Sequence, residues 1–166
     1  MGAVTTTYRA SATLTVTGGL QTLAASGTWL EGWYSDVLNN TSNLDLDTTI
    51  SGLFTKAVTA GEIRVYAFAQ CFDATYRNGF GSANTPGAAA QVTSTGMTAE
   101  KRDAAMVLLW STAFASAAST LEMPDTSLRG AFGGFLPPMV NLYVTISGAA
   151  LTAAVLYAKG YAENVA

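Results

Sequence analysis

Three oxygen-bearing side chains recur at every second position in one segment of the chain, at Asn43, Asp45 and Asp47. Positions i, i+2 and i+4 of an extended strand lie on one face, so these oxygens could converge on a calcium ion. Calcium takes about six to eight oxygen ligands, and only these three are local. A solvated strand face produces the same pattern, and we favour it over a metal site.

A pair of acidic residues flanks two aromatic residues further upstream. Glu31 and Asp36 lie on either side of Trp33 and Tyr34, and a glycosidase needs two carboxylates about 5 to 9.5 Å apart. Nothing in the sequence fixes such a separation, so we do not predict a hydrolase. Together with Trp29, the two aromatic residues could instead stack on sugar rings as a carbohydrate-binding platform. Packing in a core or a subunit interface is the simpler interpretation.

The composition removes most other chemistry. The chain has no histidine, which excludes Ser-His-Asp and Cys-His nucleophiles and histidine-based zinc sites. Its single cysteine, Cys71, excludes an internal disulfide framework and a cysteine-rich metal cluster. Charged residues make up 11% of the 166 residues, and a net charge of -3 offers no basic patch for phosphates. We therefore expect no enzyme, no cofactor, no metal site and no nucleic-acid partner.

Two stretches are the most apolar, residues 104–118 and residues 148–158. Both are shorter than the roughly 20 residues that a helix needs to cross a bilayer. The first residues also lack the basic and apolar regions of a secretory signal. We expect a soluble protein with no membrane partner.

Alternation of apolar and polar residues predicts strands along most of the chain. Residues 62–72 are expected to form a central strand, with Ile63, Val65 and Ala67 on one face and larger residues on the other. Residues 99–103 fit a short helical turn, and residues 153–161 fit a strand or a helix. The other segments expected to be strands are residues 10–17, 28–38, 44–50, 105–112, 119–123 and 140–147.

About seven to nine short strands with at most one helical turn predict a single all-β domain. We expect an antiparallel β-sandwich or jelly roll over residues 1–166, with long loops and a short N-terminal arm at about residues 1–8. A sandwich of this size leaves edge strands open, and few charged residues are present to block edge-to-edge pairing. Loops or neighbouring subunits are therefore expected to cover the edges.

Two irregular stretches are expected to contact other molecules. Residues 73–91 form a segment of about 19 residues, which is either a contact arm or an unstructured loop. Residues 129–138 place Phe and Leu side chains on a Gly- and Pro-rich backbone that does not favour a regular element. With the N-terminal arm, these stretches supply the residues predicted at contacts with neighbouring subunits or other molecules: Arg9, Tyr76, Arg77, Phe80, Arg129, Phe132, Phe135 and Leu136.

Several segments resemble small structural proteins of tailed-bacteriophage particles. The C-terminal half carries Phe132-Gly133-Gly134-Phe135-Leu136-Pro137, followed by VTISGAAL at residues 144–151 and YAKGYAE at residues 157–163. Upstream, LAASGTW at residues 23–29, NTSNL at residues 40–44 and IRVY at residues 63–66 are similar to the N-terminal half of these proteins. The similarity spans most of the chain, and its motifs are short.

The resemblance implies a non-enzymatic virion component with a β-sandwich fold, most like a head decoration (cement) protein on the outer capsid surface. Such a protein is made in the host cytoplasm. Its partners are the major capsid protein and copies of itself, in a trimer or other homo-oligomer. Relatives tend to carry basic residues after the Gly-Gly-x-x-Pro element, where this chain has Pro138-Met139-Val140. The alternative is a phage tail or adhesion component with a carbohydrate-binding β-sandwich.

Overall fold

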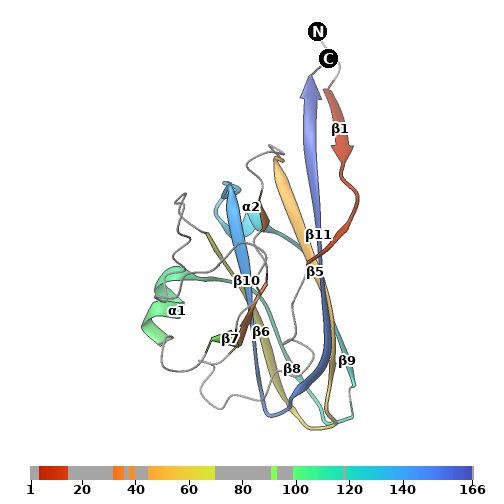
Figure 1. The fold of residues 1–166 in the computed structure, drawn as a ribbon, viewed down its shortest axis with the longest axis vertical. Helices are drawn as coiled ribbons and strands as arrows, with labels where there is room; N and C mark the ends of the chain where they lie inside the picture. Colours follow the sequence, from red (N-terminus) through yellow and green to blue (C-terminus); the bar gives the residue numbers. More distant parts are fainter. Residues whose placement is uncertain are drawn as a thin grey trace.

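Two antiparallel β-sheets pack face to face (Figure 1). This computed structural model describes residues 4–14, 32–35, 38–39, 45–69, 91–92, 99–117 and 119–165. Sheet A contains β1 (Val4–Tyr8), β2 (Ala12–Leu14), β5 (Asp47–Lys56), β9 (Thr120–Ser127) and β11 (Leu151–Val165). Sheet B contains β3 (Gly32–Tyr34), β4 (Leu38–Asn39), β6 (Gly61–Ala69), β7 (Gln91–Val92), β8 (Val107–Phe114) and β10 (Met139–Ser147).

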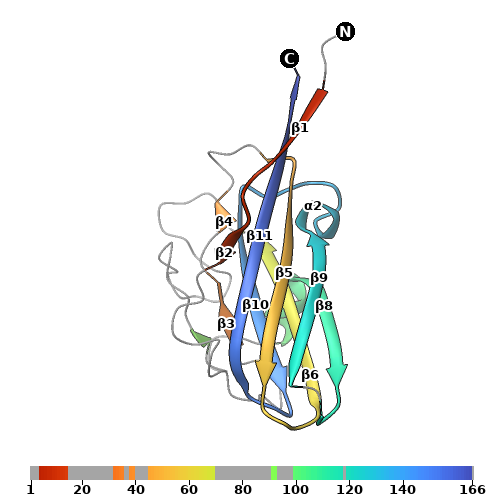
Figure 2. The ribbon, with the colours of Figure 1, turned by 90° about the vertical axis from the view of Figure 1, so that its right-hand side faces the viewer.

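The order of the strands is β1-β11-β5-β9 in sheet A, and β2 pairs with the same edge of β11 as β1 does. In sheet B the order is β7-β3-β10-β6-β8, and β4 pairs with β10. Figure 2 looks onto sheet A, with β11, β5 and β9 in front of β10, β6 and β8. The predicted all-β antiparallel sandwich is confirmed.

The core lies between the two sheets and follows the period of two that the sequence predicts. In β5 the side chains of Ile50 and Phe54 are fully buried, whereas Leu53 faces outward. The ring of Phe54 stacks on that of Trp110 from sheet B, with centroids 5.9 Å apart and planes 12° apart. In β6 the predicted core face of Ile63, Val65 and Ala67 is buried, and β6 lies between β10 and β8 as expected for a central strand.

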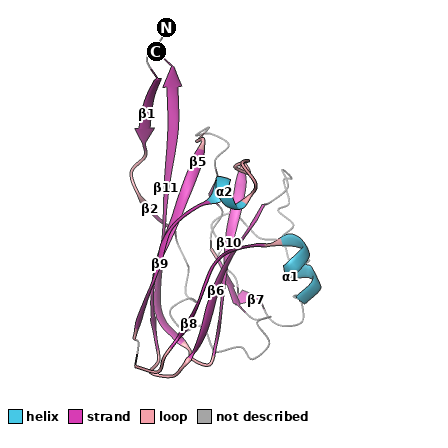
Figure 3. Ribbon diagram, turned by 180° about the vertical axis from the view of Figure 1, so that it is seen from behind, coloured by secondary structure: helices cyan, strands magenta, loops and turns pink. Residues whose placement is uncertain are grey.

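Two short helices accompany the sheets, rather than the single helical turn expected (Figure 3). The first, α1 (Ala99–Ala105), extends the predicted turn at residues 99–103. The second, α2 (Leu128–Ala131), lies in a stretch predicted to be irregular. Its N-terminus is capped by Ser127, whose hydroxyl oxygen accepts a hydrogen bond of 2.8 Å from the Gly130 N–H. Among the described residues, no helix has the length and hydrophobicity that a membrane span requires.

The structure also corrects the boundaries and burial of several strands. The strand predicted as buried at residues 105–112 is β8, an edge strand of sheet B in which Leu108 is 49% exposed. The strand expected to end before Pro124 continues as β9 to Ser127. The register of β9 against β5 shifts between Ile50 and Gly52. This irregularity accommodates Pro124, which has no N–H to donate to the ladder. Residues 153–161 belong to a strand, β11, and the helical alternative is wrong.

Candidate assembly surface

β1 and the C-terminal end of β11 form a two-stranded ribbon that extends beyond the sandwich (Figures 1 and 2). Val4 pairs with Val165 at the tip, and Tyr8 pairs with Tyr161 near the base. The neighbouring strand β5 follows β11 only as far as Tyr161, which pairs with Asp47. The N-terminal arm expected from the sequence is therefore a strand paired with the last strand of the chain.

The ribbon exposes an uncharged strand. Thr5, Thr6 and Thr7 are exposed, and Tyr8 is 67% exposed. The Tyr8 ring contacts the ring of Tyr161 at a centroid distance of 6.1 Å, and the Lys159 ammonium lies 5.3 Å from the Tyr8 centroid. A two-stranded ribbon is marginally stable by itself in water, so its protrusion favours a role in contacting another molecule.

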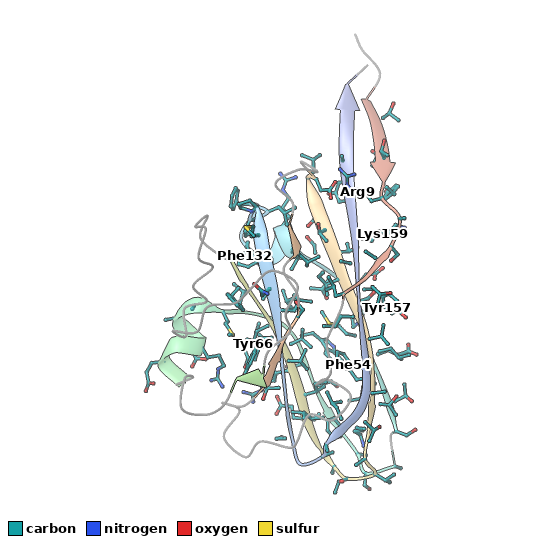
Figure 4. All side chains as sticks on the ribbon, in the orientation of Figure 1. Arg9, Phe54, Tyr66, Phe132, Tyr157 and Lys159 are labelled. Carbon is teal, nitrogen blue, oxygen red and sulfur yellow. The ribbon has the colours of Figure 1, made fainter. Side chains whose placement is uncertain are left out.

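An ion pair holds the base of the ribbon. The Arg9 side chain lies at the base of the ribbon (Figure 4). Its guanidinium donates to the Asp45 carboxylate, and the backbone N–H of Arg9 donates to the carbonyl of Gly160 at 2.9 Å. A Cβ atom on Gly160 would collide with the Asp45 carboxylate, so a larger residue at this position would displace Asp45 from its place beside Arg9. Arg9, predicted at an intersubunit contact, thus makes an intramolecular ion pair, and its side chain remains 40% exposed.

The solvated-face interpretation of Asp45 and Asp47 is wrong. The side chain of Asp45 is only 6% exposed in its ion pair with Arg9. Asp47 is buried, and its carboxylate accepts hydrogen bonds from the Thr48 N–H at 2.7 Å, the Arg129 N–H at 2.8 Å and the Ser127 hydroxyl. Asp47 therefore joins the start of β5 to the N-terminus of α2. Asn43 lies outside the described residues.

The segment that contains α2 exposes one large apolar side chain. Phe135 is 65% exposed, whereas Phe132 and Leu136 pack against the core. Arg129 is exposed, and its guanidinium donates to the Gly134 carbonyl at 2.9 Å. α2 lies at the end of the sandwich from which the ribbon projects (Figures 1 and 3). The other predicted contact residues, Tyr76, Arg77 and Phe80, lie outside the described residues.

A polar depression lies on the outer face of sheet A. It has a volume of about 240 Å³ and is lined by Ser11, Thr49, Ser51, Asp125, Tyr157 and Lys159. Tyr157 pairs with Ser51 across β11 and β5, and Lys159 pairs with Thr49. An aromatic ring beside hydroxyl, carboxylate and ammonium groups is a set that could bind a sugar.

Sequence reasoning missed this depression because its residues come from four separate parts of the chain. The only local signal was the spacing of Tyr157 and Lys159, which places both on one face of β11. Of the predicted carbohydrate platform, Trp33 and Tyr34 belong to β3 and pair with Val144 and Tyr143 of β10. Their side chains, and Trp29, lie outside the described part of the structure.

The shifted pKa values belong to ion pairs of neighbouring residues. The Arg102 guanidinium donates to the Asp103 carboxylate at 2.8 Å, which raises the pKa of Arg102 and lowers that of Asp103. Arg102 also lies over the ring of Tyr66, 5.7 Å from its centroid, and this contact attaches α1 to sheet B. A hydrogen bond to Glu62 raises the pKa of Arg64 in the same way. Each ion pair lies within one element, α1 or β6, and neither lines the depression or the ribbon.

Comparison of the chain with models of protein families, with curated proteins and with solved structures finds no match.

Proposed function

We propose that this chain is a non-enzymatic structural protein of a tailed-bacteriophage particle, a head decoration (cement) protein on the outer capsid surface. Its partners are the major capsid protein and other copies of the chain, in a trimer or other homo-oligomer. The observation that carries the proposal is the protruding β1/β11 ribbon, which exposes an uncharged strand edge away from the sandwich. The sequence resemblance supplies the identity of the particle.

The chemistry of the exposed surface supports a role in assembly. Burying a charge in an interface costs desolvation energy, whereas threonine and aromatic side chains bury with little loss. β1 carries only Val, Thr and Tyr, and only 11% of the whole chain is charged. Phe135 lies at the same end of the sandwich as the ribbon, so this end of the molecule exposes both a strand edge and an apolar side chain to contacts in an assembly. Many copies on a lattice would add weak contacts through avidity.

Replacement of Phe135 by aspartate tests this surface. The F135D variant should bind particles that lack the protein at least about tenfold more weakly, because the charge would be buried at the contact. Its free energy of unfolding should stay within about 0.5 kcal/mol of wild type, since Phe135 is exposed. Co-sedimentation with particles and urea denaturation measure the two quantities.

The matched control is V58D. Val58 is 72% exposed and lies in the loop between β5 and β6, at the end of the sandwich opposite the ribbon (Figure 1). This variant should bind particles as wild type does. Unchanged binding by F135D, or equal losses in both variants, would contradict the assignment of Phe135 to the contact.

The polar depression favours one alternative, a tail or adhesion component that binds carbohydrate. If that proposal is correct, NMR titration with neutral and acidic oligosaccharides should shift resonances around Tyr157 and Asp125. Y157A should then remove binding without unfolding the protein, because the ring supplies the stacking surface. V58A, a variant of an exposed residue in the loop between β5 and β6 that does not line the depression, serves as the control. Absence of binding to every oligosaccharide would exclude this alternative.

A further inference from the structure

Alternate residues of β1 direct their backbone groups toward an open edge. The Arg9 N–H donates to Gly160 of β11, so the backbone of Arg9 faces β11. Because these directions alternate along an antiparallel strand, Thr5 and Thr7 also face β11, opposite Asn164 and Ala162. The N–H and C=O groups of the intervening residues, Val4, Thr6 and Tyr8, therefore point to the other side. No described strand pairs with β1 on that side.

This open edge lacks the features by which proteins usually prevent edge-to-edge pairing. Such edges typically carry lysine, proline or a bulge. β1 contains no charged residue and no proline, and its register with β11 is continuous from Val4 to Tyr8. Its central residues are three consecutive threonines, which favour extended backbone. The edge is therefore suited to accept a further strand.

The three threonines of β1 are arranged symmetrically about Thr6, with Val4 and Tyr8 at the two ends of the strand. We propose that β1 pairs antiparallel with β1 of a second copy of this chain, with a two-fold axis at Thr6. Each Thr6 then faces the other Thr6, and each Val4 faces Tyr8 of the second copy. Thr5 and Thr7 also face each other, which gives favourable Thr–Thr pairs without like charges.

The backbone directions select this register. With the axis at Thr6, all three residues that face the open edge meet residues that face it in the second copy, so each pair exchanges hydrogen bonds. An axis at Thr5 would leave Tyr8 without a partner residue in the second β1, and an axis at Thr7 would leave Val4 without one. A shift of the pairing by one residue would place the outward groups of one copy opposite the inward groups of the other.

The ribbon also provides the space that this pairing needs. The ribbon projects beyond the sandwich (Figure 2). Because the paired strands run in opposite directions, the second sandwich would lie beyond the tip of the first ribbon. The two sandwiches therefore do not compete for the same volume. The two copies of sheet A become one continuous sheet across the axis, and the contact closes with two-fold symmetry.

This inference rests on the proposed function in one respect, which is that the two copies are expected to meet on the capsid lattice. A contact between two five-residue strands is weak in dilute solution, and a lattice that holds many copies close together raises their effective concentration. The pairing predicted here is between copies of the chain, whereas a strand of the capsid protein is the competing occupant of the edge.

Disulfide trapping tests the register. Facing residues that exchange hydrogen bonds have Cα atoms about 5.5 Å apart, within the range for a disulfide of about 4.4 to 6.8 Å. In a C71S background, T6C should therefore form disulfide-linked dimers on mild oxidation, both on particles and at high concentration in solution. T5C is the matched control, because the two Thr5 residues would be offset by two positions along the strands. Its dimers should form at least about tenfold more slowly, since the Cα atoms then exceed the limit of about 7 Å.

A second variant tests the hydrogen bonds without a cysteine. T6P removes the outward N–H of Thr6 and leaves those of Thr5, Thr7 and Arg9, which face β11. A mixture of the T5C and T7C proteins should form T5C–T7C disulfide dimers, because Thr5 faces Thr7 of the second copy. When both proteins also carry T6P, these dimers should be lost.

The outcomes separate this inference from the proposed function. Equal dimer yields from T6C and T5C, or a T6C disulfide to an engineered capsid cysteine in place of the dimer, would overturn the pairing. Occupied particles without any T6C dimer would overturn it as well, and the proposed function would stand. T6C dimers in solution from a protein that does not bind particles would support the pairing and contradict the proposed function.

Discussion

Replacement of Asp47 by alanine is expected to lower the free energy of unfolding by about 3 kcal/mol, because hydrogen bonds to a buried charged group contribute about 1.5 to 3 kcal/mol each and are not additive. The carboxylate accepts from two backbone N–H groups and from the Ser127 hydroxyl. Alanine leaves these donors without their acceptor between β5 and α2. The shift of the urea midpoint, followed by circular dichroism at pH 7, measures the loss.

Two further variants check the cause. D125A removes an exposed carboxylate from β9 and should change the free energy of unfolding by less than about 0.5 kcal/mol. D47N should fall between wild type and D47A, because its amide oxygen can still accept from the Arg129 N–H. If D47A is as stable as wild type, the buried carboxylate does not hold α2 to β5.

Replacement of Phe54 by alanine should have a similar or larger effect, about 4 kcal/mol, because truncating a buried aromatic side chain leaves a cavity. Phe54 is fully buried between the sheets and stacks on Trp110. The loss should therefore be accompanied by a change in tryptophan fluorescence of the folded protein. Urea denaturation gives the free energy, and the emission spectrum before unfolding reports the changed contact.

The neighbouring residue provides the control for this variant. Leu53 lies on the same strand but faces outward and is 39% exposed, so L53A should cost less than about 1 kcal/mol. Equal losses for F54A and L53A would mean that the side of β5 facing sheet B has been assigned incorrectly.

The strands of the sandwich could be predicted because their signal is local. The alternation in the expected strands places Ile50, Ile63 and Val65 in the core, and each of these residues is buried. Phe54 lies beyond the strand expected at residues 44–50, because β5 continues to Lys56. Burial of β8 could not be predicted in the same way. An apolar run is compatible with a central strand, whereas the position of β8 at an edge depends on the order of strands in the sheet.

The environment of the acidic residues could not be predicted because their partners are distant in the sequence. Asp47 meets Ser127 and Arg129, and Asp45 meets Arg9, across separations of more than thirty residues. A period of two identifies the face on which a carboxylate lies but not what packs on that face. The capping role of Ser127 was visible in principle, since serine is a preferred N-cap residue, but the helix that follows has only four residues.

The N-terminal arm was expected only as an extension of about eight residues. Its run of β-branched residues, Val4 to Thr7, is typical of a strand, yet nothing in it identifies β11 as the partner. The pairing depends on the length of β11, which continues past the end of β5. The depression beside Tyr157 is similar, because three strands and the segment at Ser11 must be placed before its residues meet.

The position of β11 in sheet A also constrains the order of events during synthesis. β11 follows every other described strand along the chain, and it is the strand that joins β1 and β2 to β5. Translation proceeds at about 5 to 20 residues per second, so β1 waits on the order of ten to thirty seconds for its partner. Sheet A cannot close before then, and a chain that terminates before β11 has no ribbon. Only chains translated through β11 can therefore present the arm.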